Sequence, residues 1–430
     1  MKTNRVARFR YLTFCLLAAA TALAQAPRGR PGPQPNQPPP QNPPPQNQLP
    51  PNPPQPNPPP ANQPPSATLG QSLAGLTTAE LLAFTDGRES FREVETPADG
   101  LGPIFNDVSC VACHSAGGIG GASRNTVTRF GRTVNGVFDP MESQGGSLLQ
   151  ARAINPAVRE VVPREANVVA QRVTTPLFGA GLIEAISDND IVLGMLRLKP
   201  FGITGRVSVV HDVASGKYRI GRFGWKAQQA TLLSFSGDAY LNEMGITNRL
   251  FPTENAPNGN TALLARFDLA PDIEDHTDPA DGKADIDRLA DFMRLLAPPP
   301  RQPVTGNAIA GERLFASLDC AVCHTPSMRT EKNLVAALSE KTVGLFSDLL
   351  LHDMGALGDG IAQGTAGVRE MRTAPLWGLR VRPTLLHDGR ANSIDAAIRG
   401  HDGEAKNSRD RYTASNAAER QALLDFLNTL

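Results

Sequence analysis

Apolar residues recur at every third or fourth position in three stretches of this 430-residue chain. These stretches are 78–91, 286–296 and 417–430. The spacing places their apolar side chains on one face of a helix, so each stretch is predicted to be an amphipathic helix packed against a core. A shorter helix is predicted over 393–399.

One segment between these helices has a different pattern. Residues 206–220 have β character, with a turn at Ser215-Gly216. The stretch 297–303, Ala-Pro-Pro-Pro-Arg-Gln-Pro, follows the second predicted helix and cannot continue it. It is predicted to be a linker between two domains.

The N-terminal residues 1–24 have the pattern of a secretory signal peptide. Four basic residues precede an apolar stretch over 11–20, and the segment closes with Ala22-Leu23-Ala24, a small-x-small cleavage pattern. The apolar stretch is too short to span a bilayer comfortably. We therefore expect export to the periplasm.

The segment that follows, 25–66, is predicted to be a disordered spacer. Residues 27–66 hold 20 of the 38 prolines of the chain, interleaved with Asn and Gln. Such a composition buries no apolar area and lacks many backbone donors. A proline-motif ligand for a partner is the alternative, and a plain spacer is the preferred interpretation.

Composition removes two classes of protein. The 42 basic and 42 acidic side chains balance, so the chain lacks the positive surface that nucleic-acid binding needs. No window of about 20 apolar residues exists, so no membrane span is predicted. Removal of residues 1–24 takes away four positive charges, which leaves 38 basic against 42 acidic side chains.

The positions of the five cysteines carry the chemistry. Cys15 lies in the predicted signal peptide, and the other four form two identical motifs: Cys110-Val-Ala-Cys113-His114 and Cys320-Ala-Val-Cys323-His324. C-x-x-C-H is the attachment signature of c-type haem, in which two thiols add to the porphyrin and the adjacent imidazole ligates the iron. The motifs predict two covalently bound haems. A zinc site and a redox dithiol are the alternatives.

The surroundings of the two motifs also repeat. Gly87-Arg-Glu-Ser-Phe91 precedes the first motif and Gly311-Glu-Arg-Leu-Phe315 the second, and each unit ends with a predicted helix. This order is that of a cytochrome c fold. We expect a mainly α protein with two cytochrome c-like domains, 67–300 and 301–430, the first enlarged by insertions with some β structure.

Several later blocks resemble one family. They are Gly102-Pro-Ile-Phe-Asn106, Gly221-Arg-Phe-Gly-Trp-Lys-Ala227, Leu241-Asn-Glu-Met-Gly-Ile-Thr247, Asp348-Leu-Leu-Leu-His-Asp-Met-Gly355, Thr373-Ala-Pro-Leu-Trp-Gly378 and Leu385-Leu-His-Asp-Gly-Arg-Ala391. With the haem motifs, they make the chain similar to exported di-haem oxidoreductases, called peroxidases or thiol oxidoreductases, within the bacterial di-haem cytochrome c peroxidase superfamily.

The resemblance implies a sixth ligand for the C-terminal haem. That ligand comes from the position fourteen residues past the His of the Leu385–Gly389 turn, which is His401 here. Metal ligands are then expected at His114, His324 and His401. Met354 is the competing ligand and Met371 a more distant one, whereas His387 is expected to be a turn residue that bonds backbone or a haem propionate.

The resemblance also implies two catalytic residues in the first domain. Trp225 matches a tryptophan that lies between the haems and helps electrons pass, and a core tryptophan is the alternative. Glu243 matches an acidic residue on the distal side of the N-terminal haem, where a carboxylate can handle the protons of hydrogen peroxide. A surface glutamate or helix cap is the alternative. Tyr240 falls near the position that corresponds to His401.

Other polar residues have weaker expectations. The acidic loop from Glu274 to Asp281 could bind calcium, with a solvated loop as the preferred interpretation. Three arginines are candidate partners of haem propionates: Arg380, Arg382 and Arg390. His211 is a candidate removable ligand, although a structural role is preferred.

The predicted function is that of an exported di-haem c-type oxidoreductase. It would reduce hydrogen peroxide, or another small oxidant, with electrons from a small donor protein. Two alternatives stay open at this point: an oxygen-activating or substrate-oxidising di-haem enzyme, and a plain di-haem electron-transfer protein.

Overall fold

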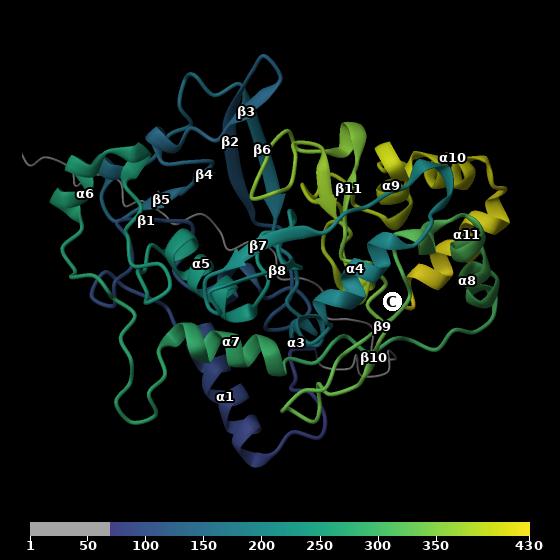
Figure 1. Ribbon diagram of the computed structural model, residues 1–430, viewed down its shortest axis with the longest axis horizontal. Helices are drawn as coiled ribbons and strands as arrows, with labels where there is room; N and C mark the ends of the chain where they lie inside the picture. The colour runs from purple at the N-terminus through teal and green to yellow at the C-terminus, as the bar shows by residue number, and fades with distance from the viewer. Residues whose placement is uncertain (1–68) are drawn as a thin grey trace, which may run out of the picture. The chain divides into compact units, whose positions relative to one another are not determined.

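The computed structural model describes residues 69–430, which belong to one compact unit. The predicted signal peptide, 1–24, and the predicted spacer, 25–66, lie outside the described residues. No helix within 69–430 combines the length and apolar composition needed to cross a bilayer. Figure 1 shows the arrangement of the helices and strands.

Two helix pairs organise the molecule. Helix α1 (Thr78–Arg92) packs against α7 (Asp285–Leu295), and α8 (Asn307–Ser317) packs against α11 (Ala417–Leu427). The helices predicted over 78–91 and 286–296 are confirmed to within one residue. The helix predicted over 417–430 is confirmed, but it ends three residues earlier, at Leu427.

The sequence repeat has a structural cause in these two pairs. A Cβ atom on Gly87 of α1 would lie 2.1 Å from the carbonyl oxygen of Arg288 in α7. A Cβ atom on Gly311 of α8 would lie 1.9 Å from the carbonyl oxygen of Ala422 in α11. Both crossings therefore require glycine, because any side chain would separate the backbones of the paired helices.

Side-chain caps fix where two of these helices begin. The Thr77 hydroxyl accepts a hydrogen bond from the backbone N–H of Glu80, and the Glu80 carboxylate accepts one from the N–H of Thr77. Asn416 and Glu419 form the same reciprocal pair before α11. Each pair satisfies two backbone donors that the first turn of a helix leaves without a partner.

The remaining α-helices lie between the paired ones along the chain. They are α2 (Cys110–Cys113), α3 (Ala180–Glu184), α4 (Asp188–Leu196), α5 (Leu232–Met244), α6 (Thr261–Phe267), α9 (Ile394–Arg399) and α10 (Lys406–Ala414). The helix predicted over 393–399 is α9, and the Ser393 hydroxyl caps it by accepting from the N–H of Ala396 at 3.1 Å.

The strands form small antiparallel sheets. They are β1 (Ile104–Phe105), β2 (Thr126–Val134), β3 (Val137–Asp139), β4 (Leu148–Leu149), β5 (Arg152–Ala153), β6 (Val168–Val173), β7 (Ser208–Asp212), β8 (Lys217–Gly221), β9 (Met328–Arg329), β10 (Thr342–Val343), β11 (Leu351–Asp353) and β12 (Glu370–Arg372). The largest sheet is built around β2, which pairs with β3, β4 and β6. The pairs β1–β5, β9–β10 and β11–β12 are two-stranded.

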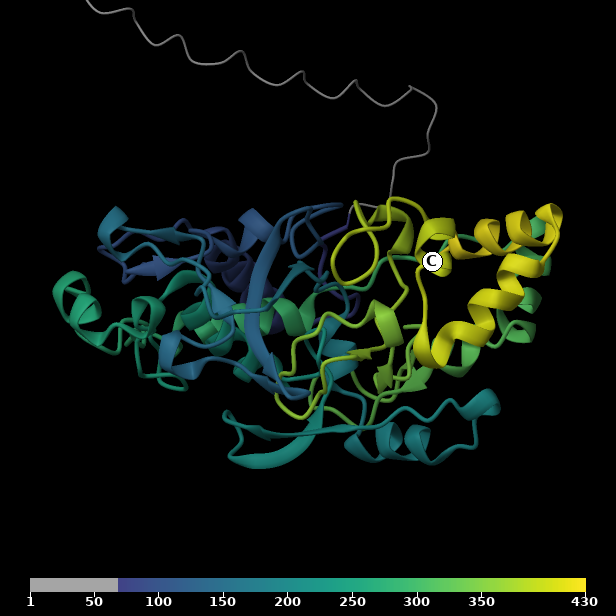
Figure 2. The same ribbon diagram turned by 90° about the horizontal axis from the view of Figure 1, so that it is seen from above.

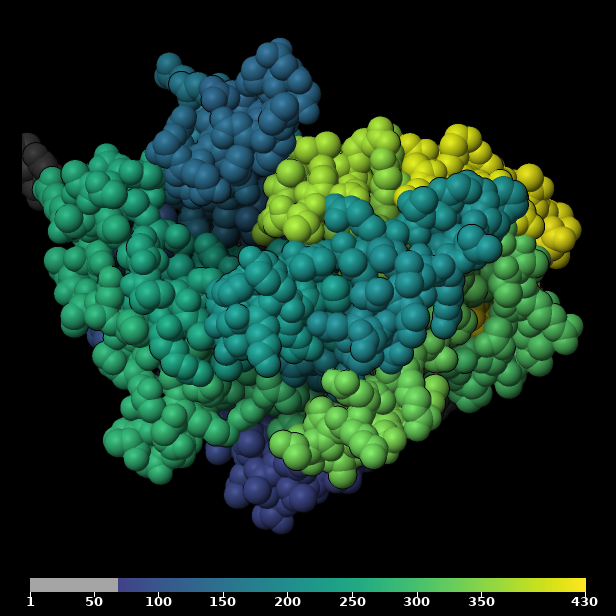
Figure 3. Space-filling view, in the orientation of Figure 1, coloured from purple at the N-terminus to yellow at the C-terminus, as the bar shows by residue number. Residues whose placement is uncertain are grey.

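The hairpin of β7 and β8 confirms the β character predicted over 206–220. Its register pairs His211 with Tyr218, and Ser215 and Gly216 form the turn. The hairpin and α4 lie on the face seen in Figure 3, and Figure 2 shows them along one side of the unit. The fold thus combines helices with several small sheets, so the prediction of a mainly α protein holds only in part.

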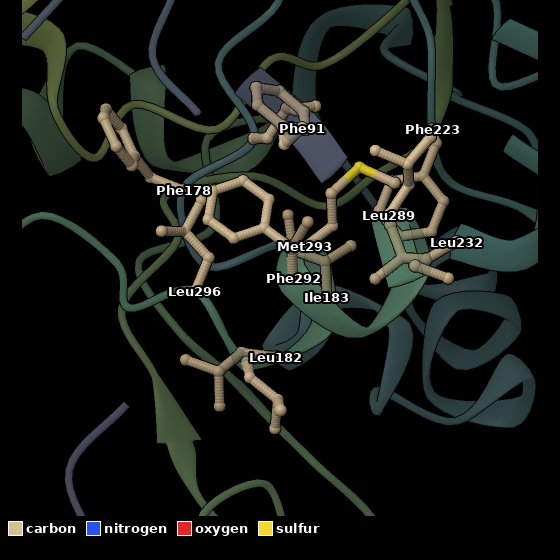
Figure 4. Close-up of a cluster of buried hydrophobic side chains, with 14 of the residues drawn as sticks. Phe91, Phe178, Leu182, Ile183, Phe223, Leu232, Leu289, Phe292, Met293 and Leu296 are labelled. Atoms are coloured by element: carbon tan, nitrogen blue, oxygen red, sulfur yellow. The ribbon is translucent and has the colours of Figure 1, made fainter. Parts of the chain in front are cut away.

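Two clusters of buried apolar side chains form the core. The larger cluster includes Phe91, Phe178 and Phe292, which Figure 4 shows with their neighbours. It also includes Leu345 and Leu350 from the second half of the chain. The smaller cluster is built from residues after 307. Because the larger core draws on both halves, the predicted boundary at 300/301 stays a prediction.

Candidate functional site

Two cavities of similar size contain the two cysteine motifs. Cys320, Cys323 and His324 line one of them, called here the C-terminal cavity, which encloses about 1350 Å³ counted with its opening to solvent. Cys110, Cys113 and His114 line the other, called here the N-terminal cavity, with about 1240 Å³. Each motif therefore adjoins its own space.

The motif histidines have the same hydrogen-bonding pattern. His114 Nδ1 lies 3.2 Å from the carbonyl oxygen of Gly121, and His324 Nδ1 lies 3.1 Å from that of Phe346. Because a carbonyl oxygen only accepts, each Nδ1 must carry the proton and each Nε2 is left with a free lone pair. Burial lowers the pKa of both imidazoles to about 4, so both are neutral at pH 7. A neutral imidazole is the form that ligates iron.

A second imidazole faces His324 in the C-terminal cavity. His401 follows α9, and its Nδ1 lies 2.7 Å from the carbonyl oxygen of Ala397, which leaves its Nε2 free in the same way. The ring centroids of His324 and His401 are 6.4 Å apart. Two imidazoles that bind one metal from opposite sides, at about 2 Å each, have ring centres roughly 6 Å apart. The pair therefore fits one metal ion between its rings.

The C-terminal cavity also contains the other sequence candidates. Met354 and Met371 both line it, so two thioethers share the space with His401. His387 lines it as well and is 3% exposed. The backbone oxygen of His387 accepts from Val173 N–H at 2.8 Å, which fits the turn role expected for this residue.

The N-terminal cavity has a different set of groups facing its space. Glu243 lines it together with Asp238 and Arg129, and His114 is the only histidine among the described residues of its lining. Met244 and Met293 are also there, and both belong to the buried apolar core. Figure 4 shows Met293 among the core side chains. Among the described residues, the lining of the N-terminal cavity thus combines carboxylates and guanidinium groups with a single histidine, whereas His401 is one of several histidines that line the C-terminal cavity.

The last turn of α5 holds Glu243 in position. The helix ends at Gly245, which has a φ of 70° and approaches the 102–104 segment so closely that a Cβ there would lie 2.6 Å from Ile104 O. Asn106 N–H donates to the Glu243 backbone oxygen at 2.7 Å, and the Asn106 side-chain amide donates to Glu243 Oε2 at 2.7 Å. These bonds fix the orientation of the Glu243 carboxylate at the C-terminal end of α5.

The environment of Glu243 favours its protonated form. Burial raises the pKa of the Glu243 carboxyl, and the nearby Asp238 adds to this. Arg129 and the hydrogen bond from Asn106 act in the opposite direction without cancelling the effect of burial. A carboxyl that gains and loses a proton closer to neutral pH is suited to acid–base work.

Trp225 adjoins both cavities. It lines the C-terminal and the N-terminal cavity, and its indole N–H donates to Val173 O at 2.9 Å. The flanking residues Arg222 and Lys226 are fully buried, and the Lys226 ammonium donates to the carbonyls of Gly367 and Glu370 at 3.1 and 2.7 Å. The turn that carries the indole is therefore tied to both halves of the chain.

Each cavity is also lined by an arginine that has a buried, unsatisfied nitrogen. The Nε atoms of Arg129 and Arg382 are buried and have no hydrogen-bond partner among the described residues. Burial lowers the pKa of both guanidinium groups to about 10, and both remain charged at pH 7. A carboxylate inside either cavity would satisfy these atoms, and a haem carries two propionates. With the free imidazole nitrogens, these atoms make the residues of both cavities fit a haem.

The alternatives for the cysteines fit less well. The two pairs line different cavities, so they do not form a shared four-cysteine zinc site. Burial raises the pKa of Cys110 and Cys320 to about 12, which keeps these thiols protonated and disfavours a redox dithiol. All four are free cysteines without a disulfide.

A buried ionic network beside Cys323 was not predicted from the sequence. His352 is 2% exposed, and its Nδ1 and Nε2 lie 2.6 Å from Glu404 and 3.0 Å from Asp348. Lys199 donates to Asp348 at 3.3 Å. Burial alone would lower the pKa of His352, but its contacts with Asp348, Cys323 and Glu404 raise it to about 12. An imidazolium that is hydrogen-bonded at both nitrogens has no lone pair for iron. His352 therefore has a structural role in the lining of the C-terminal cavity.

Most of the remaining candidate residues lie outside both cavities. His211 is exposed beside Tyr218 and lines neither cavity. Arg380 donates to the carbonyls of Leu430 and Pro300, and Arg390 pairs with Asp388 at the surface. Of the three arginines proposed for propionates, Arg382 is the one that lines a cavity.

Tyr240 and the acidic loop also have partners within the protein. Tyr240, on α5, lines the N-terminal cavity, and its hydroxyl donates a hydrogen bond to Glu95 at 2.8 Å. In the loop from Glu274 to Asp281, Asp275 accepts from the N–H of Asp285 at 2.8 Å. Asp278 and Asp281 both pair with Arg288. The calcium site predicted for this loop stays a prediction.

Sequence comparison assigns the family. The chain belongs to the family described as "Di-haem oxidoreductase, putative peroxidase", whose sequence pattern matches residues 150–430. The matched region includes Cys320, Cys323 and His324, whereas the first motif precedes it. No curated protein matches the chain.

Solved structures similar to the chain are distant in sequence. The diheme peroxidase BthA from Burkholderia thailandensis is 14% identical, with 81% of this chain and 86% of that chain covered and a TM-score of 0.38. Hydrazine synthase from Kuenenia stuttgartiensis is 14% identical, with coverages of 84% and 90% and a TM-score of 0.40. A MauG-like protein associated with microbial copper homeostasis is 15% identical, with coverages of 59% and 89% and a TM-score of 0.30. The family assignment rests on the sequence match.

Proposed function

We propose that the chain is an exported c-type di-haem peroxidase that reduces hydrogen peroxide with electrons from a small donor protein. The observation that carries this proposal is the difference between the two cavities. A second imidazole faces His324 in one, whereas Glu243 and Arg129 line the other, where His114 is the only histidine among the described lining residues. One cavity is suited to passing electrons and the other to admitting a small oxidant.

The residues proposed to hold the cofactors are those of the two motifs. Cys110 and Cys113 would attach one haem and Cys320 and Cys323 the other, through thioether bonds, while His114 and His324 would ligate the irons. His401 is the proposed sixth ligand of the C-terminal haem, because its Nε2 is free and its ring faces that of His324. Bound haems would supply one-electron redox chemistry.

Glu243 is the proposed acid–base catalyst. Reduction of one hydrogen peroxide to two waters consumes two electrons and two protons. The Glu243 carboxylate takes a proton from the entering peroxide and returns it to the oxygen that leaves as water. Asn106 holds the carboxylate through its 2.7 Å hydrogen bond, and Arg129 lowers the cost of the negative charge. Because the relayed proton is the peroxide's own, both protons that the reduction consumes come from solvent.

Trp225 is the proposed aid to electron transfer between the sites. Its indole lines both cavities and is held by Val173 O. An indole is a polarisable aromatic group, and its fixed position shortens the gap that electrons cross. The donor protein would deliver electrons first to the C-terminal site.

The test is turnover by the haem-loaded full-length protein with a reduced donor dye and hydrogen peroxide. We expect peroxide to disappear with two electrons taken from the dye per molecule and with no release of oxygen. An electron carrier would consume no peroxide. An oxygen-activating enzyme would consume oxygen when reduced without peroxide. Either result would overturn the proposal.

A further inference from the structure

A group of carboxylates lies away from both cavities, in the chain that leads from α5 to α7. Glu254, Asp268 and Asp272 each offer one oxygen, and these oxygens all lie within 4.8 Å of one another. Asp268 is the residue that follows α6, and Asp272 lies in the loop beyond it. Figures 1 and 3 show this segment, the stretch around α6, at the surface of the unit.

The innermost member, Glu254, has an unsatisfied oxygen. The residue is 8% exposed, and its Oε1 accepts from the N–H of Asn255 at 3.1 Å. Its Oε2 is buried and has no hydrogen-bond partner among the described residues. A buried carboxylate oxygen without a partner is energetically unfavourable, because no hydrogen bond or ion pair offsets its loss of hydration. No described residue therefore supplies the partner that this oxygen needs.

Burial raises the pKa of the Glu254 carboxyl to about 9, and the charge of Glu274 adds to this, so at pH 7 either a bound proton or a cation neutralises the group. Among residues 69–430, no lysine, arginine or histidine forms an ion pair with Glu254, Asp268 or Asp272, although other acids of the same stretch have such partners. Asp278 and Asp281 pair with Arg288, and Asp287 pairs with Arg249. Glu274, a fourth acid whose charge acts on Glu254, accepts only from Thr247. The mutual repulsion of these acids is left without compensation.

The spacing and chemistry select the kind of cation. Ligand oxygens that surround one Ca²⁺ at 2.3–2.6 Å lie within about 5 Å of each other, which is the separation found here. All three donors are hard carboxylate oxygens, which favour Ca²⁺ over Zn²⁺ or Cu²⁺. Asp272 is exposed, so an ion can enter from solvent and retain water ligands. We propose that Glu254, Asp268 and Asp272 form a calcium site.

The site would add a link within the stretch around α6. Glu254 precedes α6 and the two aspartates follow it, so one ion would link the chain before the helix to the chain after it. Glu274 binds Thr247, which comes three residues after the end of α5. Calcium is therefore expected to stabilise the stretch from 250 to 275. This role does not depend on peroxide reduction, and the site differs from the loop around Asp278 and Asp281.

Calcium titration of the haem-loaded full-length protein tests the site. After treatment with a chelator, isothermal titration calorimetry with Ca²⁺ and thermal unfolding are measured for the wild type and for Glu254→Gln. Wild type is expected to bind calcium and to unfold several degrees higher with it. Glu254→Gln keeps the shape but removes the carboxylate that would ligate the ion. It is expected to bind one calcium fewer and to unfold at the same temperature with calcium as with chelator.

Two further variants make the result specific. Asp268→Asn combined with Asp272→Asn is expected to abolish the same binding event without altering the buried position. Asp278→Asn is the matched control from the neighbouring acidic loop, and it should bind calcium as the wild type does. Unchanged calcium binding in Glu254→Gln and in the double variant would overturn the proposal, as would a wild type that binds no calcium. Peroxide turnover is a separate readout, so failure of one proposal is distinguishable from failure of the other.

Discussion

The two cavities are built alike on the attachment side and differently on the opposite side. In both, a C-x-x-C-H motif supplies a neutral histidine whose Nδ1 is held by a backbone carbonyl. Facing His324 is another imidazole held in the same manner, whereas Glu243, Asp238 and Arg129 line the N-terminal cavity. The two cavities thus share a motif and a helix pair but differ in the residues that line the rest of each space.

The walls of the cavities differ in charge as well. Beside the C-terminal motif, His352 is charged and bonded to Asp348 and Glu404. In the N-terminal cavity, burial raises the pKa of Glu243, so that carboxyl exchanges its proton more readily near neutral pH. A fixed ionic network braces a wall, whereas a carboxyl with a raised pKa can act on a substrate.

The largest effect is expected from Glu243→Gln. Loss of the proton carrier should lower peroxide turnover by about 10²–10⁴-fold, because general acid–base catalysis contributes in that range. Wild-type turnover should fall as the pH drops below the raised pKa of Glu243, and the variant should lack that limb. Steady-state rates across pH are the measurement, with unchanged haem spectra expected. Asp238→Asn in the same cavity is the control, and an equal loss there would contradict the assignment.

Replacement of His401 should remove the feature that distinguishes the C-terminal cavity from the N-terminal one. His401→Ala is expected to convert the C-terminal haem from low spin to a form that binds added cyanide or imidazole. His401→Met should raise its reduction potential, by a fraction of the roughly 0.8 V that axial ligands span. Redox titration followed optically measures both. If Met354→Leu gave these changes and the His401 variants did not, the ligand would be Met354.

The ionic network makes a prediction about stability and pH. The pKa of Glu404 is lowered to about 2 from 4.5, so its contribution is present above pH 4.5 and lost as the pH falls toward 2. The pKa of His352 is raised to about 12 from 6.5, so its contribution is present below pH 6.5 and lost as the pH rises toward 12. His352→Gln should cost roughly 3–5 kcal/mol near pH 6.

Chemical denaturation across pH measures this cost. The variant is expected to show a flatter pH dependence on both the acid and the alkaline side. His211→Gln, on the exposed hairpin, is the control and should change the free energy of unfolding little. An equal, small effect of both substitutions would show that the network contributes nothing to stability.

The smallest effect is expected from Trp225→Phe. The phenyl ring fills most of the space but cannot donate to Val173 O, which costs about 1 kcal/mol of stability. Electron transfer between the two sites should slow several-fold in stopped-flow experiments, with each haem spectrum unchanged. Trp377→Phe is the control, because Trp377 is a buried core residue that lines neither cavity. Equal rates in both variants and the wild type would remove Trp225 from the path.

The sequence predicted what depends on local pattern. Helices α1, α7 and α11 and the β7–β8 hairpin follow from periodicity and a turn pair within a few residues. The network that joins Lys199, Asp348, His352 and Glu404 did not follow, because its first and last members are 205 residues apart along the chain. The sheet around β2 was missed for the same reason, since β2 and β6 are paired only by the fold.

The sites show the same division. The haem motifs are contiguous and could be identified from the sequence. Glu243 and His401 could be proposed only through family resemblance, and the partners that orient them, Asn106 and Ala397, become visible only in the structure. The buried nitrogens of Arg129 and Arg382 have no local signature at all, because burial is a property of the fold.

The difference between the two cavities is tested most directly by the EPR spectrum of the ferric, haem-loaded protein, recorded with and without cyanide. The account predicts one low-spin haem that ignores cyanide, assigned to the His324–His401 cavity. It predicts a second haem that binds cyanide and changes its spectrum, and that is lost when Cys110 and Cys113 are both replaced by alanine. Two low-spin haems that both ignore cyanide would contradict the account.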